Sequence, residues 1–200
     1  MTIQSWLGMI AGVLSLTGFI PYWWAIVRGQ TRPNRATWWI WTIVGIIIAF
    51  SYRASGATST MWVPITYVIG PFCTALLAIK FGADGWTKLD TICLVGVGIG
   101  LILWGVYRSP QLTLGLNIGI DFLGALPTIR KSIRDPYSED LFSWLLFAIA
   151  NIINLLAVDL WEWQIIVYPI YMVLITTIIC WYLWWGRRQK RDRHRKNYLS

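Results

Sequence analysis

Seven apolar runs, each about long enough to cross a lipid bilayer, constrain this chain more than any other feature. A membrane-spanning helix needs roughly 20 mostly apolar residues, because each residue rises about 1.5 Å and the hydrocarbon core is about 30 Å thick. Only 13% of the 200 residues are charged, against about 25% in soluble domains. We therefore predict transmembrane helices at residues 6–27, 36–52, 61–80, 91–107, 112–130, 141–158 and 163–185.

Lys and Arg are distributed unevenly among the segments that connect these runs. Of the 17 basic residues, 15 follow the first, third or fifth run or lie in residues 187–200, and only Arg53 and Arg108 lie elsewhere. An excess of Lys and Arg in short loops marks the cytoplasmic side of a membrane. We expect a plasma (inner) membrane protein with its N-terminus outside and its C-terminus in the cytoplasm. The basic tail is expected to contact the bilayer, in particular anionic lipid, and not nucleic acid.

The sequence repeats itself at an offset of 106 residues. Residues 18–39 read GFIPYWWAIVRGQTRPNRATWW, and residues 124–145 read GALPTIRKSIRDPYSEDLFSWL. Both copies follow the pattern G-x-x-P-x6-R-x8-[ST]-W, and a Pro-Ile pair recurs at an offset of 105 in the third and seventh runs. One such match is expected by chance in a composition this biased, but the whole set is not. The chain therefore contains an internal repeat.

The repeat predicts the fold class, an all-α integral membrane protein with two parallel three-helix repeats joined by a linker helix. Three helices reverse the sidedness of a chain, so one extra helix lets both copies point the same way. We expect a first triple-helix bundle at 1–80, the linker helix at 81–109, a second triple-helix bundle at 110–186 and a basic tail at 187–200. The linker is rich in glycine, which suits close packing against a neighbouring helix.

This 3+1+3 order, with a proline near the cytoplasmic end of the first and fifth helices and a basic loop after each, resembles the SWEET and PQ-loop (MtN3-like) transporter superfamily. The resemblance covers the whole chain in topology but only the two proline segments in motif. The glutamine that names the PQ-loop is replaced by Tyr22 and Thr128, and the asparagines expected on the third and seventh helices are absent. The resemblance implies alternating access between two bundles without ATP.

Two pairs of matched residues are candidates for a hinge or gate at the cytoplasmic side. Proline within a helix removes a backbone hydrogen bond and bends the helix, so Pro21 and Pro127 could act as symmetric hinges. The matched Trp38 and Trp144 are candidates for part of the gate. Static kinks at the prolines and interfacial anchoring by tryptophan are the alternatives.

Polar residues at membrane depth are the candidates for a solute site, because they are rare there and usually functional. Asp121 lies near the middle of the fifth run and has no basic residue at similar depth, so it could also exchange protons. A structural polar cluster between helices is the alternative. Tyr67, Tyr168 and Tyr171 could add a stacking surface for a sugar or another ring. The predicted substrate-binding residues are Asn117, Asp121, Asn151, Asn154, Tyr67 and Tyr171.

Enzymatic activity is not expected from this sequence. It contains no Ser/His/Asp set, no metal-binding cluster and no phosphate-binding glycine loop, so neither a metal nor another cofactor is predicted. A retinal photoreceptor is excluded, because the seventh run lacks the lysine that a Schiff base requires.

We expect a facilitator or secondary carrier, and the resemblance implies that it moves a small polar solute, with a sugar as the first candidate. Two alternatives stay open from the sequence: a ligand-sensing or cargo receptor of the KDEL-receptor type, and a vitamin-precursor permease of the nicotinamide-riboside type. Both repeats lie in one chain, so a monomer can contain a complete pathway, and a homo-oligomer is the other arrangement that stays open.

Overall fold

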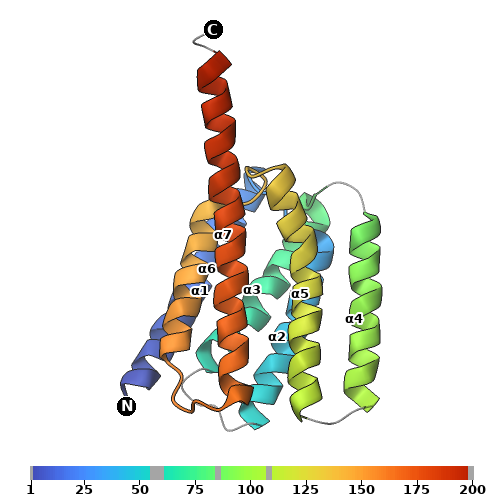
Figure 1. Cartoon of the computed structure of the whole chain (residues 1–200), viewed down its shortest axis with the longest axis vertical. Helices are drawn as coiled ribbons and strands as arrows, with labels where there is room; N and C mark the ends of the chain where they lie inside the picture. The colour runs from blue at the N-terminus through green and yellow to red at the C-terminus, as the bar shows by residue number, and fades with distance from the viewer. Residues whose placement is uncertain (1, 55–60, 84–86, 107–109, 198–200) are drawn as a thin grey trace.

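The structure is a computed structural model that describes residues 2–54, 61–83, 87–106 and 110–197. Within these ranges the chain forms seven α-helices and no β-strand. The helices run along the long axis of the molecule, and the two termini lie at opposite ends (Figure 1). The elements are α1 (Ile3–Val27), α2 (Arg35–Ala54), α3 (Trp62–Phe81), α4 (Lys88–Val106), α5 (Pro110–Arg134), α6 (Leu141–Leu156) and α7 (Trp163–Asn197).

The seven predicted helices are confirmed as helices, and the largest difference is at the end of α7. We expected this helix to end near residue 185 and a tail to follow, but α7 continues as one helix to Asn197. Its last residues extend beyond the rest of the bundle (Figure 1). The segment after Gly186 is rich in Arg, Lys and Gln and lacks Pro, and such residues favour helix strongly enough to prolong it.

Helix length and composition support membrane insertion most clearly for three helices. Within the described ranges, α1, α3 and the Ile165–Asp192 part of α7 are long and apolar enough to cross a membrane, and Arg35–Phe50 and Leu141–Leu156 are shorter apolar helices. The 16 residues of α6 span only about 24 Å at 1.5 Å per residue. These helices are compatible with a membrane protein.

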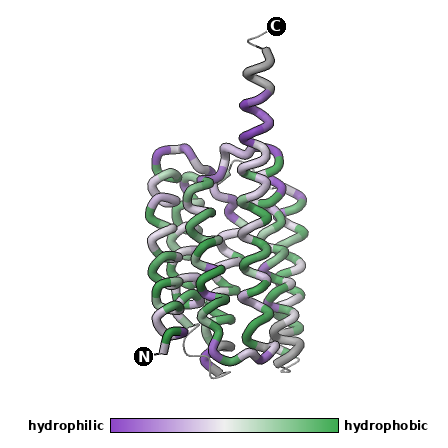
Figure 2. Tube along the Cα trace, turned by 60° about the vertical axis from the view of Figure 1, so that its left-hand side comes forward, coloured by the Kyte–Doolittle hydropathy of each residue, from purple (hydrophilic) through white to green (hydrophobic). Residues whose placement is uncertain are grey.

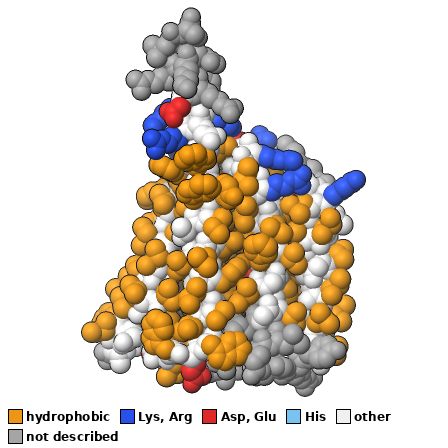
Figure 3. Space-filling model, viewed as in Figure 1, with side chains coloured by type: hydrophobic (Ala, Val, Ile, Leu, Met, Phe, Trp, Pro, Cys, Tyr) orange, Lys and Arg blue, Asp and Glu red, His pale blue; other side chains and the backbone are white. Residues whose placement is uncertain are grey.

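The side of the bundle is apolar and one of its ends is basic. Hydrophobic residues cover the length of the helices, and hydrophilic residues gather where α7 leaves the bundle (Figure 2). Lys and Arg side chains lie at this end on the visible face, above a surface of hydrophobic side chains (Figure 3). Large apolar residues such as Ile20, Phe50 and Leu174 are at least half exposed. We call the end with the C-terminus the basic end.

The helices pack in pairs that repeat between the two halves of the chain. α1 contacts α3 as α5 contacts α7, and α2 contacts α3 as α6 contacts α7. Between the halves, α1 contacts α6 and α5 contacts α2. Each of these contacts maps onto its counterpart when α1, α2 and α3 are exchanged with α5, α6 and α7. The contacts of α4 with α5 and α2 have no counterpart, and the small contact between α3 and α6 is not matched by one of the same extent between α7 and α2.

Glycines allow the closest of these approaches. A Cβ at Gly18 of α1 would lie 2.8 Å from Phe147 and 3.2 Å from Leu146 on α6. A Cβ at Gly124 of α5 would lie 2.7 Å from Ile40 on α2 and 3.2 Å from Trp41. Leu146 and Phe147 stand 106 residues after Ile40 and Trp41. The repeated glycine therefore serves the same contact in both halves, since any side chain would separate the helices.

Candidate functional site

A small cavity lies between the two halves of the bundle. The space that it leaves for the centres of water molecules is about 40 Å³. One water needs roughly 10–15 Å³ by this measure, so the cavity holds about three. Every helix except α4 contributes to its wall. The aromatic lining residues are Phe19, Trp38, Trp41, Tyr67, Trp144, Phe147 and Tyr168. The others are Gly45, Pro71, Asp121, Met172, Ile175, Thr176 and Ile179.

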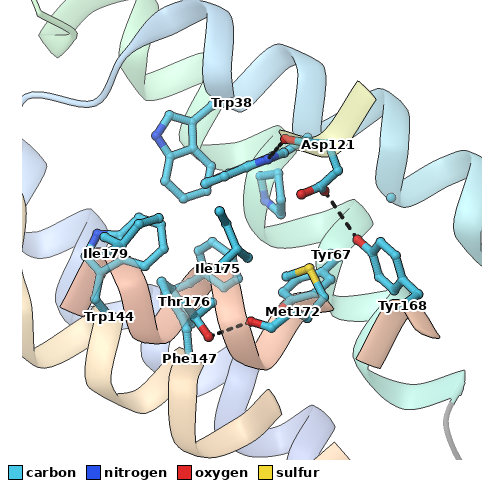
Figure 4. Close-up of a pocket in the computed structure, with 14 residues that line it drawn as sticks. Trp38, Tyr67, Asp121, Trp144, Phe147, Tyr168, Met172, Ile175, Thr176 and Ile179 are labelled. Atoms are coloured by element: carbon cyan, nitrogen blue, oxygen red, sulfur yellow. Dashed lines mark hydrogen bonds between the residues drawn. The ribbon is translucent and has the colours of Figure 1, made fainter. Parts of the chain in front are cut away.

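Asp121 is the only charged residue of this lining, and α7 holds its carboxylate in place. The Tyr171 hydroxyl donates to Oδ2 at 2.6 Å, and the Tyr168 hydroxyl donates to Oδ1 at 3.3 Å. The Trp41 indole N–H of α2 donates to the Asp121 backbone carbonyl at 3.2 Å. Asp121 is 3% exposed. The carboxylate is therefore bound by two neutral donors from α7, and α2 binds the backbone carbonyl of the same residue (Figure 4).

The hydrogen bond between Asp121 and Tyr171 has a counterpart in the first half of the chain. Ser15 of α1, which stands 106 residues before Asp121, has its hydroxyl 3.1 Å from the Thr66 hydroxyl of α3. Thr66 stands 105 residues before Tyr171. The two halves thus keep one polar contact at the same place, but only the second half carries a charge there.

Aromatic rings separate Asp121 from the basic end. Trp38 and Trp144 are both the fourth residue of their helices, which start at that end, and each is 2% exposed. Trp38 packs edge-on against Trp41 with ring centroids 5.1 Å apart, and Trp144 packs edge-on against Phe147 at 5.8 Å. The Trp41 and Trp144 rings, 5.9 Å apart, join the two pairs. In Figure 4, Trp38 and Trp144 lie on the opposite side from Asp121 and Tyr168.

α2 and α6 start in the same way. Asn34 caps the first turn of α2, with its Oδ1 accepting from the Thr37 backbone N–H at 3.0 Å. Asp140 caps α6, with its Oδ2 accepting from the Ser143 N–H at 2.8 Å. Such caps satisfy backbone donors that a helix start leaves free. Both caps and both capped residues are 106 positions apart, so each places its tryptophan at the same register.

Glu139, which the sequence does not single out, is buried in a network at the basic end. Its side chain is 0% exposed. Oε2 accepts from the Tyr22 hydroxyl of α1 at 2.5 Å and from the Trp144 indole N–H at 3.1 Å. Oε1 lies 2.5 Å from the Lys131 Nζ of α5. Arg187 of α7 donates to the Glu139 backbone carbonyl at 2.6 Å. This residue therefore connects helices of both halves.

Of the six predicted substrate-binding residues, Asp121 and Tyr67 line the cavity. Tyr171 supports Asp121 from outside this lining. The Asn151 amide contacts the Tyr67 hydroxyl, with Nδ2 at 2.7 Å, and also donates to the Phe147 carbonyl at 3.0 Å.

The other two, Asn117 and Asn154, are buried outside the lining, and neither side-chain oxygen has a hydrogen-bond partner. Asn117 shares a helix face with Asp121, but the cavity does not reach one turn further along α5. Of the four predicted hinge and gate residues, Trp38 and Trp144 line the cavity.

Pro21 and Pro127 both lie inside their helices but not in this lining. Pro21 instead borders an outer groove between α1 and α6, together with Trp24 and Phe142. Pro127 is buried.

No group of three or more His, Cys, Asp or Glu side chains that could hold a metal ion occurs in the described part of the chain. Comparisons with protein-family models, with curated proteins and with solved structures find no match for this sequence.

Proposed function

We propose that this chain is a seven-span membrane carrier that moves a small solute by alternating access, with its basic end in the cytoplasm. Three long apolar helices, an apolar outer surface and the 15-to-2 division of basic residues support this topology. α2, α4, α5 and α6 then cross the membrane in the same bundle, and α2, α4 and α6 present exposed apolar side chains such as Phe50, Ile102 and Leu156.

Two three-helix repeats, α1–α3 and α5–α7, form the moving parts, and α4 joins them. The repeated helix contacts, the matched glycine approaches and the matched caps support this division. α4 packs tightly against the second repeat, since a Cβ at Gly96 or Gly100 would lie 2.8 Å from a side chain of α5. α4 also contacts α2 of the first repeat, but less extensively than it contacts α5, so movement of the first repeat would break few of its contacts. This arrangement is the one that the resemblance to SWEET and PQ-loop transporters implies.

One observation carries the proposal of transport: the cavity that contains Asp121 is lined by helices of both repeats. A site shared between two units opens to one side or the other when the units rock against each other. Here the aromatic pairs and the Glu139 network close it toward the basic end. The structure therefore fits a state that is closed to the cytoplasm.

A receptor of the KDEL-receptor type is the competing proposal, because the same cavity could bind a ligand without releasing it across the membrane. Counterflow in proteoliposomes separates the two. Vesicles loaded with an unlabelled solute are diluted into the labelled solute, across a panel of sugars, amino acids, nucleosides and organic cations. A carrier accumulates label transiently, whereas saturable binding without accumulation would favour the receptor. Thermal-shift screening of the same panel selects the solutes to test, since ligands stabilise the folded state to which they bind.

The basic end supports a contact with anionic lipid. Arg187, Arg188 and Arg191 line a surface pocket with Tyr137 and Trp184. Arg188 lies over the Trp184 ring, with its guanidinium carbon 5.4 Å from the centroid. Clustered arginines beside interfacial aromatics fit the phosphates of lipid headgroups on the cytoplasmic face.

A further inference from the structure

We propose that the central cavity binds a small organic cation whose charge is quaternary or delocalised, held by the Asp121 carboxylate and the surrounding aromatic rings. This inference names the substrate class of the proposed carrier, and it rests on that function for the view that the cavity is a solute site. An organic cation, which the lining of the cavity favours, takes the place of the sugar expected from the resemblance.

Asp121 is buried, its carboxylate oxygens accept hydrogen bonds from the hydroxyls of Tyr168 and Tyr171, and no basic side chain of the described residues pairs with it. A buried carboxylate without a counter-charge is strongly disfavoured at membrane depth. A cationic ligand would supply the missing charge. The local basic residues cannot, because they lie at the ends of the helices.

A sugar needs many hydrogen bonds, and most polar groups of the lining are already bonded to the protein. The exception is the Trp38 indole N–H, which is buried without an acceptor. The Tyr67 hydroxyl contacts Asn151, the Thr176 hydroxyl donates to the Met172 carbonyl at 2.7 Å, and the Trp41 N–H donates to the Asp121 carbonyl. Few donors and acceptors are left for a polyol, and a site that cannot pair a sugar's hydroxyls rejects it. A methylated or aromatic cation asks for far fewer hydrogen bonds.

Seven aromatic side chains line the cavity, and three of them are indoles, the rings with the strongest attraction for a cation. Aromatic cages of this kind recognise quaternary ammonium groups, because the negative π-faces replace water around a charge that donates no strong hydrogen bond. A metal ion fits poorly, since Ca²⁺ and Mg²⁺ require several oxygen ligands, and Asp121 is the only carboxylate in the lining.

Binding to the purified full-length chain in detergent tests this inference. The probes are choline and N-methylpyridinium, with 3,3-dimethyl-1-butanol, the uncharged isostere of choline, and glucose as neutral controls. We expect both cations to raise the apparent unfolding temperature saturably and both neutral compounds to leave it unchanged. Stabilisation by glucose without stabilisation by a cation, or equal stabilisation by choline and its isostere, would overturn the proposal, as would stabilisation by none of the four.

Variants locate the site. Asp121→Asn keeps an oxygen acceptor and removes the charge, so it should weaken cation binding about 30-fold or more. Phe147→Leu keeps an apolar side chain without a ring and should weaken binding about tenfold. Ser15→Ala removes the equivalent hydroxyl from the first repeat and should leave binding unchanged. Equal affinities in Asp121→Asn and Ser15→Ala would place the cation elsewhere.

Binding and passage fail separately. Cation binding without counterflow would contradict the carrier proposal but support the cation site. Counterflow of a neutral solute without cation binding would support the carrier proposal and contradict the cation site.

Discussion

Glu139 should hold the basic end of the bundle closed, and replacing it is the sharpest test of that role. Glu139→Ala removes the acceptor of the buried Tyr22 hydroxyl and of the Trp144 N–H, together with the partner of Lys131, whose side chain is only 16% exposed. Breaking a buried ion pair by removing one partner costs about 3–5 kcal/mol. We expect a loss of this size in the free energy of unfolding, measured by denaturation in mixed micelles.

Two further variants divide this loss into parts. Glu139→Gln keeps an oxygen for Tyr22 and Trp144 and loses only the pair with Lys131, so it should cost less, about 1–3 kcal/mol. Asp135 lies in the same loop and pairs with Lys190 at 3.2 Å, but both side chains are about half exposed. Asp135→Ala should therefore change stability by about 1 kcal/mol at most. A Glu139→Ala variant no less stable than Asp135→Ala would refute the reasoning.

A second measurement reports how often the basic end opens, through the labelling of a cysteine in the cavity. Thr176 lines the cavity, so Thr176→Cys, in a chain whose three native cysteines are replaced by alanine, reports access to it. If the Glu139 contacts form only in the closed state, their loss removes about 3 kcal/mol of stabilisation from that state. The ratio of open to closed molecules then rises roughly 100-fold. A membrane-impermeant thiol reagent on the cytoplasmic side should then label the cysteine much faster in Glu139→Ala. Unchanged labelling would show that the network stabilises both states equally.

Three other predictions concern packing, protons and lipid. Gly124→Ala should destabilise the fold by about 1–3 kcal/mol through overpacking. Gly98→Ala is the control, because a Cβ there meets nothing within 4 Å, and it should not destabilise the fold. Equal unfolding free energies of the two variants would contradict the close-contact role of Gly124. Asp121→Asn should abolish any dependence of uptake on pH, and a profile identical to that of the wild type would exclude proton coupling through this residue. Arg188→Gln combined with Arg191→Gln should reduce the stabilisation by anionic lipid in nanodiscs, with zwitterionic lipid as the control.

The helices and the repeat could be predicted because both depend on local sequence. Apolar runs determine helix positions whatever the packing, and the G-x-x-P pattern records contacts that both halves preserve, as Gly18 and Gly124 show. The extension of α7 could not be predicted from the apolar run alone, because it depends on helix propensity outside that run.

The site was predictable only in part, because side-chain partners come from distant segments. Asp121 stood out as a carboxylate within an apolar run, but its partner Tyr171 is 50 residues away. Asn154 resembled a lining residue by type, yet it lies about two turns further along α6 than the lining residue Phe147, and the cavity does not extend to it. Glu139 lies among the charged residues of a connecting segment, where solvent exposure is the usual expectation. Its repeat counterpart is Pro33, so the repeat offers no signal for it either.

The pairing of Ser15 with Asp121 across the repeat has a consequence for how such a protein can arise. An assembly of two identical three-helix chains must present every side chain twice, once on each side of the symmetry axis. Two facing carboxylates at that depth would repel each other, and two serines would carry no charge at all. Joining the copies through α4 removes this restriction, because each copy can then change alone. A fused chain can therefore carry a single negative charge at its centre, whereas a symmetric dimer cannot.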